Sequence, residues 1–301
     1  MFVLAHLSDP HLSPLPAPTV SELLGKRVTG YLNWHLRRGA HHSRQVLDAL
    51  VDDLFAQKPD HVAVTGDIAN LSLEAEFAEG RRFLARLGEP ARVTVIPGNH
   101  DAYVRSTNGR YLSAWREYLL GDEPAEPPFP FLRRRGPIAL VGLSTAVPTP
   151  PFFASGRLGR AQLDRLAALL AELHKEPCFR VVLIHHPPAG ERPWLKRLED
   201  AAAFRDVIAR HGAELILTGH DHIASLTEIA GPERPVPVVQ VPSTSAVLND
   251  PRGGGAYNLY RIAGAPGAWS CDMESRGFRP DGTIGVLGRT SLAASAQRRV
   301  R

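Results

Sequence analysis

Five short segments of the chain combine aspartate, asparagine and histidine, the residue types that hold metal ions. They read Asp-Pro-His at 9–11, Gly-Asp at 66–67, Gly-Asn-His-Asp at 98–101, His-His-Pro at 185–187 and Gly-His-Asp-His at 219–222. Two Asp, one Asn and four His side chains could coordinate two metal ions if one carboxylate is shared between them. The sequence therefore predicts a binuclear metal site, provided that the fold brings these segments together.

Each segment follows an apolar run that we expect to form a β-strand. The runs are residues 2–7, 61–65, 93–96, 181–184 and 215–218. In an open α/β sheet, the loops at the carboxyl ends of the strands converge on one crevice, which is where ligands bind. We therefore expect the five segments to meet in space although they are far apart in the sequence.

The spacing within the segments favours convergence on a ligand. Side chains alternate along an extended backbone, so His220 and His222 point to the same side while Asp221 faces away. The Asp-x-His segment has the same geometry. A glycine before Asn99 and His100 allows a sharp turn that brings both side chains close to a ligand. Each pattern is weak alone, but five of them in order at strand ends form a strong signal.

Strands and helices alternate along most of the chain, which favours an α/β fold. We expect one domain over residues 1–276 and a partly ordered tail at 277–301, with an insertion at 13–43 near the active site. After residue 222 the pattern changes to short runs that we expect to form antiparallel strands of a second sheet. These runs are residues 225–229, 238–241, 256–262 and 268–275.

The composition of the 301 residues is that of a globular protein, with 44% hydrophobic and 22% charged residues. A net charge of +4 suits a small anionic substrate, but the chain lacks the long basic stripe of a nucleic-acid-binding protein. Arginines 133–135 are interpreted as solvated surface. Cys178 and Cys271 are not in a CxxC pair, and we expect reduced structural thiols in a cytoplasmic protein, with a single disulfide as the alternative.

The five segments, in this order, resemble the motifs of the calcineurin-like metallophosphoesterases, which are D-x-H, G-D, G-N-H-D/E, H and G-H-x-H. The resemblance covers residues 3–222, and His-His-Pro-Pro at 185–188 is most similar to class III cyclic-nucleotide phosphodiesterases. It implies a four-layer αββα sandwich of two mixed sheets flanked by helices. It also implies one metal ion held by Asp9, His11, Asp67 and His222, and a second held by Asp67, Asn99, His185 and His220.

The chemistry of such a site is hydrolysis of a phosphoester. Two divalent ions about 3.5–4 Å apart lower the pKa of a shared water and neutralise charge on phosphoryl oxygens. We expect a hydrolase that cleaves phosphodiesters by attack of a bridging hydroxide, with Mn, Fe or Zn as the metal and cyclic nucleotides as the leading substrate class by resemblance. His100 is expected to stabilise the transition state or protonate the leaving oxygen, oriented by a carboxylate such as Asp101.

Several alternatives stay open at this point. Residues 21–38 mix apolar and aromatic side chains with basic ones, so the insertion could be a lid, an interfacial helix on anionic lipids, or a packing element. Lipid contact would fit hydrolysis of a lipid-linked phosphodiester or pyrophosphate, as in UDP-2,3-diacylglucosamine hydrolases, although those enzymes carry Arg where His100 stands. A non-catalytic scaffold with the same fold is the third alternative, and the oligomeric state is not predicted.

Two pairs of neighbouring histidines need separate interpretation. The resemblance places the ligand two residues before proline, which favours His185 over His186. His41 and His42 are expected to lie in solvent at the start of a helix, with proximity to the site as the alternative.

Overall fold

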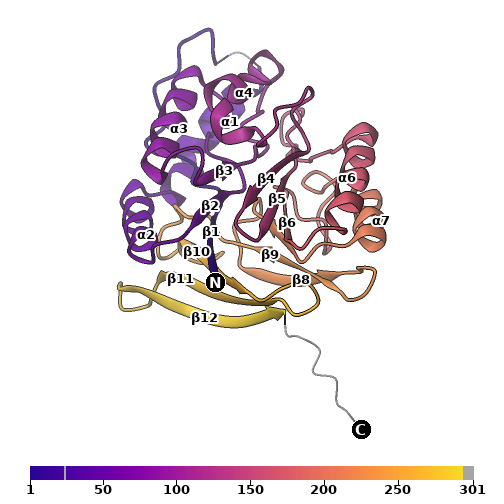
Figure 1. Cartoon of the computed structure of the whole chain (residues 1–301). Helices are drawn as coiled ribbons and strands as arrows, with labels where there is room; N and C mark the ends of the chain where they lie inside the picture. The colour runs from indigo at the N-terminus through magenta and orange to yellow at the C-terminus, as the bar shows by residue number, and fades with distance from the viewer. Residues whose placement is uncertain (24, 294–301) are drawn as a thin grey trace.

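The first half of the chain builds a parallel β-layer. In a computed structural model that describes residues 1–23 and 25–293, β1 (Phe2–Leu7) pairs in parallel with β2 (His61–Val64), and β2 pairs in parallel with β3 (Val93–Val95). Helices α2 (Arg44–Ala56) and α3 (Glu74–Leu87) connect these strands and cover one face of the layer (Figure 1). Parallel connections require such crossovers, which leave all three carboxyl ends at the same edge.

The second half builds another sheet with its own helical cover. Its strand order is β4-β5-β6-β7-β9-β8, and helices α6 (Arg160–Leu173) and α7 (Ala201–His211) lie on the outer face (Figure 1). The strands are β4 (Phe131–Arg135), β5 (Ile138–Gly142), β6 (Phe179–Leu183), β7 (Leu215–Thr218), β8 (Ser225–Ile229) and β9 (Val236–Gln240). Strands β5, β6, β7 and β9 are parallel, whereas β4 and β8 are antiparallel to their neighbours.

The last three strands join the first sheet, which corrects two expectations. β10 (Ala256–Ala263) pairs antiparallel with β1, and β11 (Ser270–Phe278) and β12 (Ile284–Ala293) follow it, so the runs after residue 222 are divided between two sheets. The expected tail from residue 277 is wrong as far as residue 293, because these residues finish β11 and form β12. The remainder of that segment, 294–301, lies outside the described residues.

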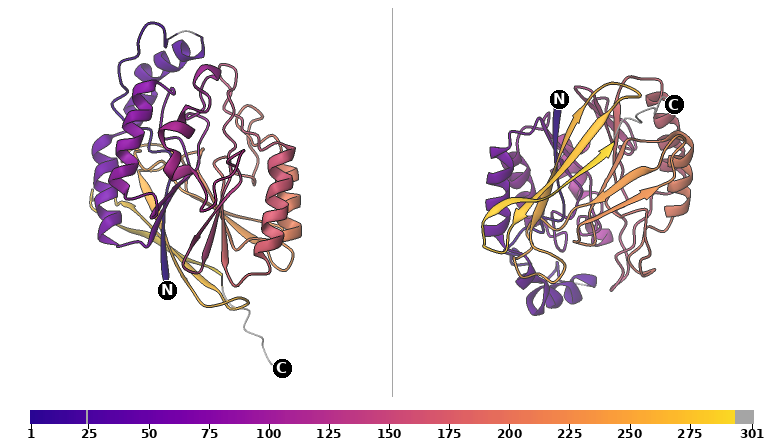
Figure 2. Two further views of the ribbon diagram at one scale, coloured as in Figure 1. Left: turned by 45° about the horizontal axis from the view of Figure 1, so that its top comes forward. Right: turned by 90° about the horizontal axis from the view of Figure 1, so that it is seen from below.

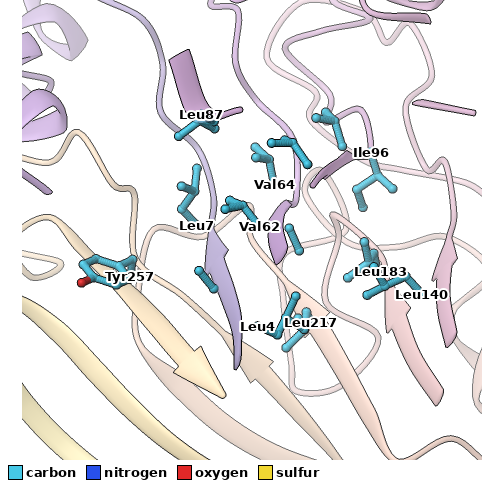
Figure 3. Close-up of a cluster of buried hydrophobic side chains, with 14 of the residues drawn as sticks. Leu4, Leu7, Val62, Val64, Leu87, Ile96, Leu140, Leu183, Leu217 and Tyr257 are labelled. Atoms are coloured by element: carbon cyan, nitrogen blue, oxygen red, sulfur yellow. The ribbon is translucent and has the colours of Figure 1, made fainter. Parts of the chain in front are cut away.

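The two sheets face each other across the main hydrophobic core. Figure 3 shows leucine and valine side chains of the first sheet, among them Leu4 and Val62, beside Leu140, Leu183 and Leu217 of the second sheet. Five of the six β1 side chains are buried, as expected for a strand covered on both faces. In both views of Figure 2 the strands lie between the indigo helices of the first half and the pink and orange helices of the second half. The predicted four-layer αββα sandwich of two mixed sheets is confirmed.

The remaining helices lie in the connections. The insertion forms α1 (Lys26–Leu36) and a 3-10 turn η1 (Arg38–His41), at the end of the molecule toward which β1 runs (Figure 1). Between β3 and β4 lie η2 (Arg105–Thr107), α4 (Arg110–Ala114) and α5 (Arg116–Leu119). None of the helices within residues 1–23 and 25–293 is long and apolar enough to cross a bilayer.

Arg133 corrects the interpretation of arginines 133–135 as solvated surface. Its side chain is 3% exposed, and its guanidinium donates to the backbone carbonyl oxygens of Pro90, Val93, Glu117 and Leu120 at 2.6–2.7 Å. A buried charge is tolerated when it is fully hydrogen-bonded. Arg133 therefore ties β4 to the end of α5 and the start of β3.

Candidate active site

The five motif segments meet at the carboxyl ends of β1, β2, β3, β6 and β7. All seven predicted ligands lie together there, and six of them are almost fully buried, His220 being somewhat more exposed. Eight non-glycine residues in the described part of the chain have a positive φ, and five of these are predicted ligands: Asp9, His11, Asp67, His220 and His222. Such backbone strain concentrates at functional sites, where the surrounding structure enforces it.

One group of ligand atoms surrounds Nε2 of His11. It lies 3.1 Å from Nε2 of His222, 3.9 Å from Oδ1 of Asp9 and 3.8 Å from Oδ2 of Asp67. Nδ1 of His11 donates to the carbonyl oxygen of Ala69 at 3.2 Å, so its proton points away from the group. Oδ1 of Asp9 is buried without a hydrogen-bond partner among the residues that the structure describes.

A second group surrounds Oδ1 of Asn99. It lies 3.2 Å from Nε2 of His185 and 2.9 Å from Nδ1 of His220. The opposite ring nitrogens donate to the carbonyl oxygens of Thr65 (2.6 Å) and Lys196 (2.9 Å), so both protons again point outward. Three ligand atoms therefore face one another, and a cation would satisfy all three.

Asp67 connects the two groups through a single oxygen. Its Oδ2 lies 3.8 Å from Nε2 of His11 and 3.4 Å from Nε2 of His185, while its Oδ1 accepts the backbone N–H of His100 at 2.7 Å. One carboxylate oxygen thus faces both groups, as a bridging ligand must.

The electrostatics of the pocket favour positive charge. Burial opposes ionisation of Asp67, yet the nearby imidazoles hold its pKa well below the usual range. Burial also lowers the pKa of His185, but the charges of Asp67 and Asp9 overcome this effect and raise it to about 10. A proton on His185 thus compensates the negative charge of the two buried carboxylates, and a divalent ion can take the place of that proton. The donor set of carboxylate, amide and imidazole groups fits Mn, Fe or Zn.

Asp101 does not contact the ring of His100, which corrects its expected role. Its Oδ1 accepts the backbone N–H of Ala69, and its Oδ2 accepts those of Asp67 and Gly98, at 2.8–2.9 Å. The carboxylate therefore fastens the loop after β2 to the loop after β3. Burial and the charge of Asp67 raise the pKa of Asp101 to about 7, against the effect of these donors.

The ring of His100 is held by a carbonyl group instead. Nδ1 of His100 donates to the oxygen of Asn70 at 2.5 Å, and the ring stacks on Tyr103 with centroids 5.4 Å apart. Nε2 of His100 accepts a hydrogen bond from Nη1 of Arg38 at 2.9 Å. Burial and the neighbouring guanidinium lower the pKa of His100 to about 3, so the imidazole is neutral in this pocket.

Sequence reasoning missed His42, which we expected in solvent. The side chain is buried, its ring centroid lies 4.7 Å from that of His11, and one of its nitrogens joins the ligand atoms of His11 and His222. Trp34 stacks on its other side with an interplanar angle of 4°. No motif marks His42, because its position depends on how the insertion folds back. His186 lies beside the site but bonds to Thr145 and Ala154.

Segments distant in sequence fix the motif loops. Ser243 donates through its hydroxyl to the carbonyl oxygen of Asp9 at 2.7 Å, and the Thr244 hydroxyl donates to the carbonyl oxygen of Ser8 at 3.1 Å.

A Cβ atom at Gly66, which has φ +94°, would lie 2.4 Å from the nitrogen of Gly98. The loops after β2 and β3 are therefore packed too closely for a side chain at Gly66.

The fold and this pocket together define a metal-dependent phosphoester hydrolase class. The calcineurin-like phosphoesterase family matches residues 2–224, and the chain belongs to this family. A comparison with curated protein sequences finds no match.

Solved structures with similar folds include metallophosphatases. A dimetal phosphatase from Danio rerio superposes with a TM-score of 0.62 at 13% identity, covering 98% of this chain and 99% of the other. The purple acid phosphatase PPD1 from yellow lupin superposes with a TM-score of 0.56 at 13% identity, covering 96% of this chain and 53% of the other. At such identities the similarity establishes the fold.

Proposed function

We propose that this protein is a binuclear-metal phosphodiesterase, with cyclic nucleotides as the leading substrate class. The observation that carries the proposal is the position of Asp67, whose Oδ2 faces both groups of ligand atoms. Asp9, His11 and His222 would complete one metal site, and Asn99, His185 and His220 the other. Metal ions bound there would polarise phosphoryl oxygens and lower the pKa of a water molecule.

The protein groups around the pocket would orient the reacting centre. Carbonyl oxygens hold the outward protons of His11, His185 and His220, so their inner nitrogens are fixed toward the pocket, and a bound metal ion would take the place of the second proton of His185. His100 presents Nε2 to the pocket while Nδ1 is committed to Asn70. With a neutral ring, Nε2 of His100 is a hydrogen-bond acceptor that can hold the guanidinium of Arg38 or a substrate proton, and either of its two expected roles would require Nε2 to be protonated in the substrate complex.

The proposal is tested with bis-p-nitrophenyl phosphate, the monoester p-nitrophenyl phosphate and a set of cyclic nucleotides, each with added Mn²⁺. We expect metal-dependent hydrolysis with the diesters preferred, abolished in Asp67→Ala. Asp164→Asn is the matched control, because Asp164 is exposed and, among residues 1–23 and 25–293, pairs with Arg160 alone on the surface of α6. Absence of turnover with Mn, Fe or Zn would favour the non-catalytic scaffold, and preference for the monoester would make this protein a phosphatase.

A second substrate class, lipid-linked phosphodiesters or pyrophosphates, is favoured by the surface of the insertion. Val28, Leu32 and Leu36 follow one another at i+4 spacing along α1 and are 44%, 53% and 78% exposed. Phe152 and Trp194, which are 81% and 62% exposed, lie on two loops that contact each other through the rings of Phe153 and Trp194. Lys26 links the first of these loops to α1 through Thr149. An exposed apolar stripe beside a metal pocket suits an interfacial contact.

Vesicles separate the two substrate classes. We expect Leu32→Ser with Leu36→Ser to abolish sedimentation with anionic vesicles and leave hydrolysis of bis-p-nitrophenyl phosphate unchanged. Thr29→Ser, on the exposed part of the same helix, is the control. If the unchanged protein stays in solution with vesicles of every charge, the lipid-linked class is withdrawn.

We also propose a cytoplasmic location. Cys178 and Cys271 are both free thiols, which suits a reducing compartment. Cell fractionation tests this, and recovery of the protein outside the cytoplasm would contradict it.

A further inference from the structure

Arg38 reaches from the insertion into the metal pocket. Its Nη1 donates to Nε2 of His100 at 2.9 Å and its Nη2 donates to Nε2 of His11 at 3.2 Å. His11 belongs to the first group of ligand atoms, and His100 borders the second through its backbone bond to Asp67. The guanidinium therefore lies against a ligand of the first group and against His100, whose backbone holds the shared carboxylate of Asp67.

The backbone at Arg38 is fixed on both sides. Before it, Trp34 is 5% exposed, and a Cβ atom at Gly39 would lie 3.0 Å from the Trp34 carbonyl oxygen, so the turn packs tightly on α1. After it, the carbonyl oxygen of His41 accepts the N–H of Val247 at 3.0 Å. The His42 ring is bonded to Ser245 at 2.8 Å. The backbone that carries Arg38 is thus held in place by packing and hydrogen bonds on both sides.

Arg38 has no carboxylate at salt-bridge distance within residues 1–23 and 25–293. Its hydrogen bonds go to two imidazoles, whereas Arg192 and Arg252, on neighbouring loops, pair with Asp221 at 2.5 Å and Asp250 at 3.1 Å. A metal ion on His11 would occupy the lone pair that Arg38 now uses. The guanidinium would then lie close to bound cations, and an anion between them would relieve the repulsion.

We propose, on the basis of the function inferred above, that Arg38 binds the non-bridging oxygens of the substrate phosphoryl group. A guanidinium offers two parallel N–H donors that match two phosphoryl oxygens. Arg38 would hold the phosphoryl group against the metal pair and neutralise charge that develops during attack. The insertion is therefore part of the substrate site, and it supplies a phosphoryl-binding residue that none of the five motifs contains.

The test measures binding of inorganic phosphate by calorimetry to the Mn²⁺-loaded protein, with metal content determined for each variant. We expect Arg38→Gln to weaken phosphate binding by about 10-fold to 100-fold, the loss typical of a charge-assisted hydrogen bond, at unchanged metal content. Arg38→Lys, which keeps the charge but not the paired donors, is expected between the two. The matched control is Arg37→Gln at the neighbouring exposed arginine, which should bind phosphate as the unchanged protein does.

Two results would overturn the proposal. One is an Arg38→Gln variant that binds both metal and phosphate as the unchanged protein does. The other is a loss of phosphate affinity that only follows a loss of metal, which would make Arg38 a positioning residue for His11. Phosphate binding is measured at equilibrium and needs no turnover. If the protein hydrolyses no diester, the proposed function is refuted, but the phosphate measurement still decides whether Arg38 binds the phosphoryl group.

Discussion

The carboxylate of Asp101 offers the sharpest test of how this pocket is built, through the substitution Asp101→Asn. The carboxylate accepts three backbone N–H groups with two oxygens, and an amide can replace only one of these oxygens. The amide nitrogen must then face at least one buried N–H, most simply that of Ala69. An unsatisfied buried donor costs about 1–3 kcal/mol, and two bonds to a neutral acceptor lose about 1 kcal/mol each.

Relief of the repulsion between Asp101 and Asp67 offsets part of this loss. We therefore expect the free energy of unfolding to fall by about 2–4 kcal/mol in urea titrations in the presence of EDTA. We also expect Mn²⁺ affinity to fall by about 10-fold to 100-fold, because the loops carrying Asp67 and Asn99 are no longer joined. Asp164→Asn, at an exposed residue of a surface ion pair, should change stability by less than about 0.5 kcal/mol.

The opposite pattern would refute this account of Asp101. If Asp101→Asn keeps its stability and metal affinity and alters only the pH profile of turnover, the carboxylate acts through His100. The role expected from the sequence would then be right and the hydrogen bonds described above would be misleading.

Three further results are expected. Burial lowers the pKa of Lys26 to about 8 from the 10.5 of the unfolded chain, so the folded protein loses this proton at a lower pH than the unfolded chain does. The free energy of unfolding, compared with that of Lys26→Met, should therefore rise by about 1–2 kcal/mol between pH 7 and 10.5. Parallel pH curves for the two proteins would contradict this. Gly66→Ala should lower both stability and metal content, measured by thermal unfolding and elemental analysis, because its Cβ would meet Gly98 and His185; full metal content would show that the loops can move apart. Mn²⁺ at about 100 times its dissociation constant should stabilise the protein by about 2.7 kcal/mol per site over EDTA-treated protein, and a similar gain in Asp67→Asn would count against a shared ligand.

The motif loops could be predicted from the sequence because their determinants are local. An apolar run of four to six residues, followed within a few residues by a polar ligand and by a glycine or proline beside it, defines a strand end, and the strands at 2–7 and 215–218 were predicted with their observed bounds. Convergence then follows from parallel topology alone. The order of strands beyond residue 222 could not be predicted, because the choice of β1 as the partner of β10 is a pairing between segments about 250 residues apart.

The parts of the site that escaped prediction depend on contacts between distant segments. Arg38 and His42 reach the pocket because Trp34 is buried and residues 245–247 bind the end of the insertion. Asp101 stands next to His100 in sequence, but the loop turns its carboxylate toward backbone N–H groups. Arg133 is buried because four carbonyl oxygens happen to surround it. None of these environments leaves a pattern in the neighbouring residues.

The hydroxyl groups of Ser243 and Thr244 have a consequence for where the chain may be shortened. The family match ends at residue 224, yet the loop that carries Asp9 is held by hydrogen bonds from these two side chains. A truncation after residue 224 would keep all five motifs but would remove Ser243 and Thr244, which hold the loop after β1. It would also remove β10, which pairs with the edge of β1. The functional domain therefore extends beyond the residues that match the family, because the last quarter of the chain holds Asp9, the first metal ligand, in place.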